Sequence, residues 1–272
     1  MEGRNPAVCV KDSCSHKVNL NCGVPQGSVA GPLMFILYSS PIQDIITSYG
    51  IKTVLYADDT QLFITFKSED RAQAITSIEK CIADVKSWAT ENKLVLNGAK
   101  TKLLHLTSRF VNNNIVPPSV VIGETTITSL PLARNLGITM DSNLCMQDHI
   151  DNVCRSALAA IRKIGKIRNF LDDSNTAKLV HAFVTCRLDA CNALLHGLPD
   201  SYLNKLQHTQ NTASRLVART PRAQHITPVL RSLHWLPIKH RTSYKILLLT
   251  FKALHQLAPL YISDMISCYN PT

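Results

Sequence analysis

Two adjacent aspartates, Asp58 and Asp59, have the type and spacing that most directly suggest chemistry in this sequence. They lie between two apolar runs of strand length, Thr53–Ala57 and Gln61–Phe66, which predict a β-hairpin. Both runs look buried on two faces, and a divalent metal with oxygen ligands would offset two desolvated like charges. On this stretch alone, an exposed turn that carries two aspartates is the simpler interpretation, because Asp favours turns.

A second candidate is the loop GVPQGS, Gly23–Ser28, which is dense in Gly, Pro and Ser. An apolar segment follows and predicts a helix over Gly31–Ile46, with Pro32 tolerated in the first turn. Such a loop presents unpaired N–H groups and lets another backbone approach closely, which suits contact with a nucleotide or a nucleic-acid strand. As an isolated loop, it is explained more simply as a structural turn.

The elements that must position these residues follow in the chain. Periodic apolar residues predict a helix over Ser68–Asn92. Lys100 and Lys102 border a predicted strand and could reach a phosphate, although a solvated lysine is the simpler alternative. The predicted strands are Leu94–Leu96 and Thr101–Leu106 around the turn Asn97-Gly98, the hairpin Val120–Ile122 with Thr125–Leu130, and Leu132–Ile138.

The second half of the chain differs in charge and in pattern. Residues 151–272 contain 16 Lys and Arg against 6 Asp and Glu, whereas residues 1–150 contain 13 of each, so the whole net charge of +10 lies in the second half. This asymmetry indicates either a polyanionic partner or simple solubility charge. Five helices are predicted, with Ser174 and Asp200 as N-caps: Asp151–Asn169, Ser174–Leu195, Ser201–Val217, Ile226–Leu233 and Arg241–Leu257.

The first of these helices has basic residues opposite its apolar positions, which suit either phosphates or a solvated face: Arg155, Arg162, Lys163, Lys166 and Arg168. The 272 residues, 45% of them hydrophobic, exclude a generally disordered or fibrous chain. Nine cysteines without Cys-x-x-Cys spacing predict reduced thiols and an intracellular protein, nuclear or cytoplasmic. The apolar runs are too short to span a bilayer, so no membrane partner is expected.

Taken in order, four segments resemble the reverse transcriptase domain of non-LTR (LINE-type) retrotransposons. They are GVPQGSVAGPLMFILY (Gly23–Tyr38), YADDTQLF (Tyr56–Phe63), LVLNGAKTKLLHL (Leu94–Leu106) and LARNLGITMDSNLCMQDHI (Leu132–Ile150). Their order and intervals match the later half of that family's palm and the helical region after it. The resemblance implies an α+β fold, with a partial palm of antiparallel sheet and packed helices over residues 1–149. Residues 150–272 would then form a basic, all-α region similar to a thumb or tail.

The resemblance also implies an activity, which is template-primed nucleotidyl transfer by an RNA-directed DNA polymerase with Mg²⁺. Its partners would be an RNA template, a DNA primer and dNTPs, and the basic half would bind nucleic acid. Asp58 matches the position of a metal ligand in that family, and Asp59 matches the residue that supports it. Lys100 matches a lysine to which protonation of the leaving pyrophosphate is assigned. The residues that match template and nucleotide contacts are Gly23, Pro25, Gln26, Gly27, Ser28 and, at the primer end, Tyr56.

One part of the family pattern has no counterpart in this sequence. In the family, the first catalytic carboxylate follows an apolar strand that precedes the Pro-Gln-Gly loop. Only 22 residues precede Gly23 here, and neither Glu2 nor Asp12 follows such a strand. We therefore expect an N-terminally truncated domain that is inactive alone. The alternatives are a non-enzymatic, nucleic-acid-binding remnant that acts through the basic half, and a relic that does not fold stably.

Overall fold

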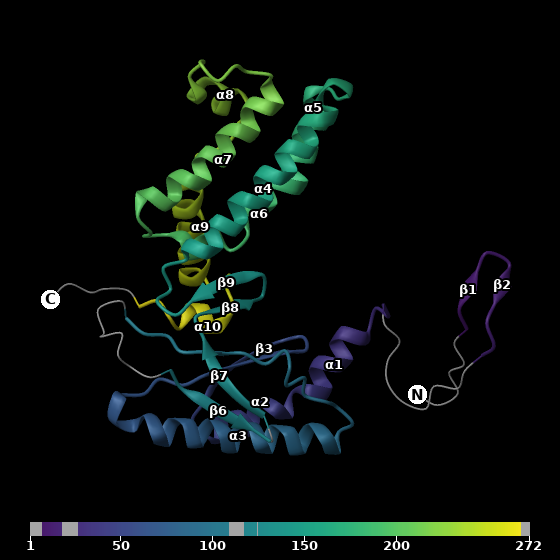
Figure 1. Cartoon of the computed structure of the whole chain (residues 1–272), viewed down its shortest axis with the longest axis vertical. Helices are drawn as coiled ribbons and strands as arrows, with labels where there is room; N and C mark the ends of the chain where they lie inside the picture. The colour runs from purple at the N-terminus through teal and green to yellow at the C-terminus, as the bar shows by residue number, and fades with distance from the viewer. Residues whose placement is uncertain (1–6, 18–26, 109–116, 124, 268–272) are drawn as a thin grey trace. The chain divides into compact units, whose positions relative to one another are not determined.

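The computed structural model describes residues 7–17, 27–108, 117–123 and 125–267 (Figure 1). These residues form two compact units. One contains the described residues up to Leu103 and those of 116–129, and the other contains those of 104–115 and from Leu130 onward. Each unit combines helices with small antiparallel sheets, which is compatible with the predicted α+β class. The palm and a boundary after residue 149 stay predictions.

The first described residues form a two-stranded hairpin of β1 (Cys9–Val10) and β2 (Ser13–Cys14). Cys9 lies opposite Cys14, with the two Cα atoms 4.1 Å apart, and the two side chains form a disulfide. The prediction of reduced thiols is therefore wrong for this pair, because antiparallel pairing brings the two sulfurs together. The sequence runs Ala7–Val10 and Val18–Cys22 each predict a short strand. The first strand begins only at Cys9, and the second run lies outside the described residues.

The predicted helix over Gly31–Ile46 is divided in two, α1 (Gly31–Ser39) and α2 (Pro41–Ser48). The division falls at Pro41, which lacks an N–H group and suits the first position of a new helix. Helix α2 buries Ile42 and Ile46, which lie in one apolar cluster with Ile51.

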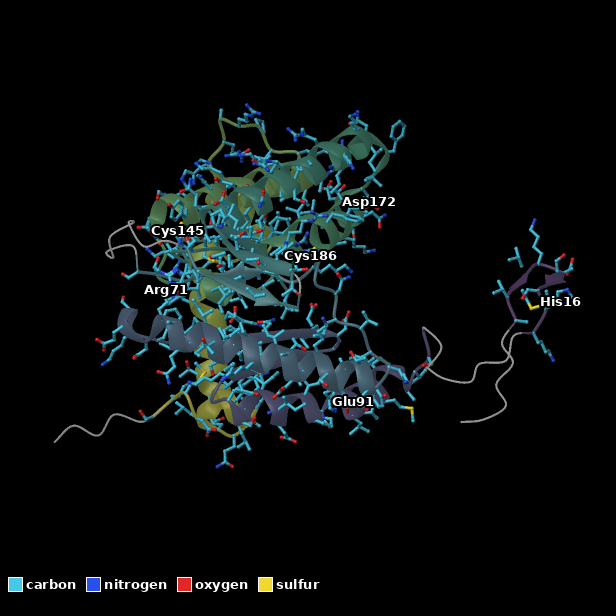
Figure 2. All side chains as sticks on the ribbon, turned by 60° about the horizontal axis from the view of Figure 1, so that its bottom comes forward. His16, Arg71, Glu91, Cys145, Asp172 and Cys186 are labelled. Carbon is cyan, nitrogen blue, oxygen red and sulfur yellow. A yellow bond between two sulfur atoms is a disulfide. The ribbon has the colours of Figure 1, made fainter. Side chains whose placement is uncertain are left out.

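The strands β3 (Lys52–Tyr56) and β4 (Asp59–Phe63) form the predicted hairpin. The predicted helix over Ser68–Asn92 is also confirmed: a 3₁₀ turn η1 (Ser68–Asp70) leads into α3 (Arg71–Glu91), whose two ends are labelled in Figure 2. Cys81 and Val85 of α3 enter the same cluster as Ile46. The hairpin, α2 and α3 therefore share one core.

The next part of the chain contains less strand than predicted. The N–H of Leu94 donates to the carbonyl of Ala89 at 2.7 Å, which closes the end of α3, and Leu94–Leu96 is not a strand. Of the predicted strand Thr101–Leu106, only β5 (Leu103–Leu104) forms. The predicted hairpin of β6 (Ser119–Ile122) and β7 (Thr125–Leu130) is confirmed, and the three strands form a sheet in the order β5-β7-β6.

The second unit contains a hairpin where one strand, Leu132–Ile138, was predicted. Strands β8 (Leu132–Asn135) and β9 (Ile138–Asp141) pair across a two-residue turn. Leu136 and Gly137 adopt φ angles of 44° and 85°, and such left-handed backbone is what a tight hairpin turn needs. The single-strand prediction fails because it overlooked this turn.

All five predicted helical stretches of the second half are helical, although the second consists of several short pieces. In chain order the elements are α4 (Gln147–Ile167), η2 (Arg168–Phe170), α5 (Asp173–Val180), the π-helix η3 (His181–Thr185), α6 (Cys186–Asp189), η4 (Asn192–Leu195), α7 (Asp200–Ala218), α8 (Ile226–Ser232), α9 (Ile238–Leu254) and α10 (Leu260–Ser263). No helix of the described ranges is both long and apolar enough to cross a lipid bilayer.

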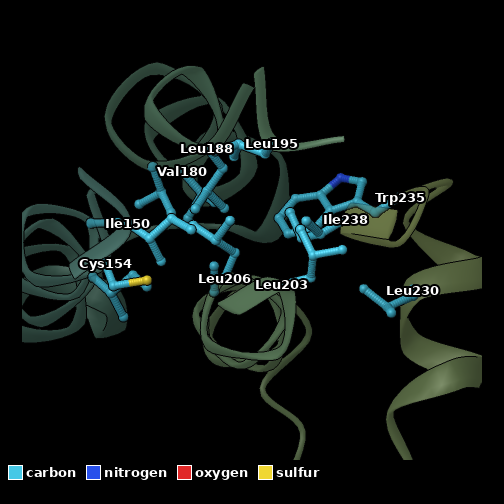
Figure 3. Close-up of a cluster of buried hydrophobic side chains, with 14 of the residues drawn as sticks. Ile150, Cys154, Val180, Leu188, Leu195, Leu203, Leu206, Leu230, Trp235 and Ile238 are labelled. Atoms are coloured by element: carbon cyan, nitrogen blue, oxygen red, sulfur yellow. The ribbon is translucent and has the colours of Figure 1, made fainter. Parts of the chain in front are cut away.

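The core of this unit lies between α4, α7 and the segment from α5 to η4, with Trp235 and Ile238 at one side (Figure 3). Both predicted N-caps are wrong. The carboxylate of Asp172 accepts a hydrogen bond from the N–H of Asn175 at 2.6 Å and caps α5 in place of Ser174. Helix α7 is preceded by Pro199, so Asp200 lies in its first turn.

Candidate functional site

The tip of the β3–β4 hairpin presents the predicted acidic pair. Antiparallel register places Tyr56 opposite Asp59, which leaves Ala57 and Asp58 as a two-residue turn. Ala57 adopts a φ of 53°, a left-handed conformation that tight turns use. Asp58 therefore lies at the turn itself, and Asp59 is the first residue of β4.

One face of the hairpin is exposed, so the expectation that both faces are buried is wrong. Leu55 and Leu62 pack against the core cluster, because alternate residues of a strand point to opposite faces. Tyr56 on the other face is 62% exposed, and Asp58 and Asp59 are exposed as well. Since water solvates both carboxylates, their charges alone do not require a metal.

The oxygen atoms of the acidic pair suit a divalent cation, but two carboxylates are too few ligands for a two-metal site. Polymerases use pairs of divalent ions, and carboxylate oxygens are suitable ligands for such hard cations. Within the described ranges, however, no group of three or more His, Cys, Asp and Glu side chains lies close enough together to hold a metal. Asp58 and Asp59 by themselves therefore do not make a complete two-metal site.

The structure describes part of the predicted loop before α1. Gly23, Pro25 and Gln26 lie outside the described residues, whereas Gly27 and Ser28 are inside them. Gly27 has a φ of 85°, which supports the special backbone geometry predicted for this loop. The hydroxyl oxygen of Ser28 is buried and has no hydrogen-bond partner among the described residues.

Lys100 lies in a turn rather than beside a long strand. Its N–H donates to the side-chain oxygen of Asn97 at 3.2 Å, and its own side chain is exposed. Among the described residues, no hydrogen bond or ion pair joins Lys100 to Asp58 or Asp59. The structure therefore presents these predicted site residues on separate elements.

A third carboxylate with a defined environment, Asp141, was missed by the sequence reasoning. It accepts hydrogen bonds from the N–H groups of Asn143, Cys145 and Met146 at 3.1, 2.9 and 2.7 Å. Burial raises the pKa of Asp141, but these donors outweigh burial and hold the pKa below its usual value. Its role is structural, because the three donors lie in the short segment that joins β9 to α4. The sequence signal was an Asp shortly before a helix.

The comparison with protein families covers the span that contains the hairpin. Residues 8–140 match the family described as reverse transcriptase (RNA-dependent DNA polymerase). The chain carries a reverse transcriptase domain. The matched span includes every residue proposed from the sequence for this site, from Gly23 to Lys100.

Curated relatives of this reverse transcriptase domain are proteins of mobile elements. The chain is 28% identical over 225 residues to the probable RNA-directed DNA polymerase from transposon X-element of Drosophila melanogaster. The aligned residues cover 80% of this chain and 24% of the relative. It is 25% identical over 229 residues to the RNA-directed DNA polymerase from mobile element jockey of Drosophila funebris, over 81% of this chain and 24% of the relative. No solved structure matches the chain.

A third relative is the Pol polyprotein from type-1 retrotransposable element R1 of Nasonia vitripennis, 27% identical over 148 residues, 53% of this chain and 43% of the relative. These relatives confirm the predicted reverse transcriptase domain of the non-LTR retrotransposon type. The chain spans about a quarter of the length of the X-element and jockey proteins.

Proposed function

We propose that this reverse transcriptase domain takes part in RNA-directed DNA synthesis, as part of a polymerase palm. In this proposal Asp58 and Asp59 are carboxylates of the catalytic site, with Mg²⁺ as the metal, since oxygen ligands suit it. Lys100 protonates the leaving pyrophosphate in this proposal. The proposed contacts to the RNA template, the DNA primer and the incoming dNTP are Gly23, Pro25, Gln26, Gly27, Ser28 and Tyr56.

The observation that supports this proposal is the hairpin tip within the family match. Asp58, Asp59 and Tyr56 are exposed together there, while Leu55 and Leu62 fix the opposite face to the core. A rigid element that presents carboxylates to solvent suits a large substrate, because a primed template must reach the metal ligands from outside.

We further infer that this chain alone binds a primed template without extending it. Nucleotidyl transfer by two metals needs more ligands than two adjacent carboxylates, and the described residues do not offer a third one nearby. A further carboxylate, from outside the described residues or from another chain, would complete the site.

A primer-extension assay tests both parts of the proposal. The purified chain is incubated with a primed RNA template, Mg²⁺ and dNTPs, beside Asp58→Asn and the control Asp70→Asn, which changes an acidic residue of η1. We expect binding of the primed template and no extension by any of the three proteins. Extension that Asp58→Asn abolishes would support the polymerase assignment and refute inactivity. Absence of template binding would remove support for both.

A second function, nucleic-acid binding by the helical unit, is favoured by cations on α4 that lack acidic partners. Arg155, Arg162 and Lys166 are exposed and lie seven and four residues apart, which places them on one helix face. None of the three forms an ion pair with another described residue, whereas Lys205 pairs with Asp151 at 2.7 Å on the same unit. Unpaired cations on one face suit the phosphates of a nucleic-acid backbone.

The salt dependence of binding tests this second function. Neutralised phosphates release counterions, so we expect the affinity for RNA and for DNA to fall steeply as salt rises. The location proposed for such a protein is intracellular, nuclear or cytoplasmic, where nucleic acid is present. An affinity that stays constant from low to moderate salt would count against binding through these cations.

A further inference from the structure

A groove on the helical unit lies between α4 and the segment that runs from α5 to α6. Ala159, Ala160 and Ile167 of α4 line one side, and Leu179 of α5 and Phe183 of η3 line the other. Its volume of about 450 Å³ is within the range of sites that hold small organic groups. Two alanines leave room for a flat ring to lie against the helix.

Phe183 offers an aromatic surface in this groove. It is 49% exposed although it is a large apolar side chain, and it belongs to the π-helix η3. Insertions of π-helix into α-helices are rare and often occur at functional sites. Here the insertion separates α5 from α6, and Val184 beside it is fully buried in the core. The ring of Phe183 is thus presented from an anchored segment.

The charge of the groove comes from two cations. Lys163 and Arg187 both line it, and its lining contains no acidic residue. The guanidinium of Arg187 donates to the hydroxyl of Ser156 on α4, which holds this cation across the groove and leaves its other N–H groups for a ligand. Neither Lys163 nor Arg187 forms an ion pair with another residue of the described ranges. An aromatic ring beside two cations favours a ligand that is both aromatic and anionic.

We propose that this groove binds one nucleobase of a single-stranded nucleic acid, stacked on Phe183, with the neighbouring phosphates on Lys163 and Arg187. This inference rests on the proposed nucleic-acid binding of the helical unit and adds the form of strand and the contact. Bases of a duplex are stacked inside it, whereas an unpaired base can turn out onto an aromatic side chain. Stacking of this kind tolerates any base sequence.

A fluorescent base analogue tests the proposal on the full chain. A short single-stranded RNA that contains 2-aminopurine is titrated with wild type, Phe183→Leu and Phe183→Trp, each first checked for an unchanged thermal transition. We expect wild type and Phe183→Trp to quench the base, because quenching reports stacking. Phe183→Leu should lose the quenching and about tenfold in affinity. The matched control is Phe170→Leu, which changes a phenylalanine that is 88% exposed and outside the groove, and should behave as wild type.

The outcomes distinguish this proposal from the proposed nucleic-acid binding of the helical unit, on which it rests. If Phe183→Leu quenches and binds as wild type does, while affinity still falls with salt, the groove is not the base site and the helical unit still binds nucleic acid. If a duplex of the same sequence competes as well as the single strand, the assignment to unpaired bases is wrong. If wild type shows no salt-dependent binding to either form, both proposals fail.

Discussion

Tyr56 and Asp59 lie directly opposite each other across the antiparallel β3–β4 hairpin, with Ala57 and Asp58 as the turn between them. Directly paired residues of two strands point to the same face of the sheet, so the ring of Tyr56 and the carboxylate of Asp59 share the exposed face. Leu55 points to the opposite face, where it packs on the core cluster. The hairpin therefore separates residues available to a substrate from residues that hold the fold.

This separation predicts different effects on stability within one hairpin. We expect Asp58→Asn and Asp59→Asn to change the free energy of unfolding by less than about 0.5 kcal/mol, because both side chains are exposed. Leu55→Ala should cost about 2 kcal/mol through lost packing. Urea unfolding of the three variants measures these values. A loss of about 2 kcal/mol in Asp58→Asn would show that its carboxylate supports the fold.

Arg168 is predicted to be a structural residue, unlike its basic neighbours on α4. It is 6% exposed, and its guanidinium donates to the carbonyls of Leu216, Leu171 and Val217 at 2.9, 2.6 and 2.8 Å and to the carboxylate of Asp173. We expect Arg168→Met to lower the free energy of unfolding by about 3 kcal/mol, since buried carbonyls lose their donors.

The partner and a neighbour of Arg168 provide the controls. Asp173 is 70% exposed, so Asp173→Asn should cost less than about 1 kcal/mol. Arg162→Gln, on the exposed face of α4, should leave the thermal transition unchanged. Equal losses in Arg168→Met and Arg162→Gln would mean that the buried hydrogen bonds of Arg168 contribute nothing measurable.

Asp141 predicts a pH dependence of stability. Its folded pKa is lowered, so the folded state favours the charged form more than the unfolded state does. The stabilisation is complete above the unfolded pKa, and it is lost as pH falls through the folded pKa. We expect Asp141→Asn to destabilise the protein by about 2 kcal/mol at neutral pH. The difference from wild type should shrink in acid, as unfolding curves from pH 7 to 3 would show.

The control for this prediction is Asp148→Asn, in the first turn of α4. Within the described residues, Asp148 does not accept backbone hydrogen bonds of the kind that Asp141 accepts. Asp148→Asn should therefore leave the acid dependence of wild type intact. A gap between wild type and Asp141→Asn that stays constant at all pH values would contradict the ionic role assigned to Asp141.

Local pattern predicted most elements of the fold, but it missed the tight turn between β8 and β9. Spacing of apolar residues was sufficient for the β3–β4 hairpin and for α3. Spacing failed at Leu132–Ile138, because the backbone of Leu136 and Gly137 reverses the chain within the stretch assigned to one strand. Spacing also failed at Leu94–Leu96, because the N–H of Leu94 donates to the carbonyl of Ala89 at the end of α3.

The candidate site was predictable only in part. Asp58 and Asp59 stand out in the sequence, but their exposure depends on which face of the hairpin meets α2 and α3, and this is a tertiary property. Phe183 gave no signal, since it lies inside a stretch that reads as one continuous helix. Its position in a groove beside Lys163 depends on a π-helix and on packing against α4.

The central claim about the helical unit is that α4 binds nucleic-acid phosphates through Arg155, Arg162 and Lys166. Its most direct test is the slope of log affinity for single-stranded RNA against log salt. Wild type is compared with two variants. The α4 variant changes these three residues to Gln, and the control variant changes three exposed lysines elsewhere on the same unit to Gln: Lys178, Lys245 and Lys252.

Each phosphate contact to a single strand contributes about 0.7 to the slope. The α4 variant should therefore lose about 2 from the slope, while the control variant keeps the slope of wild type. Equal slopes in wild type and the α4 variant would contradict the account.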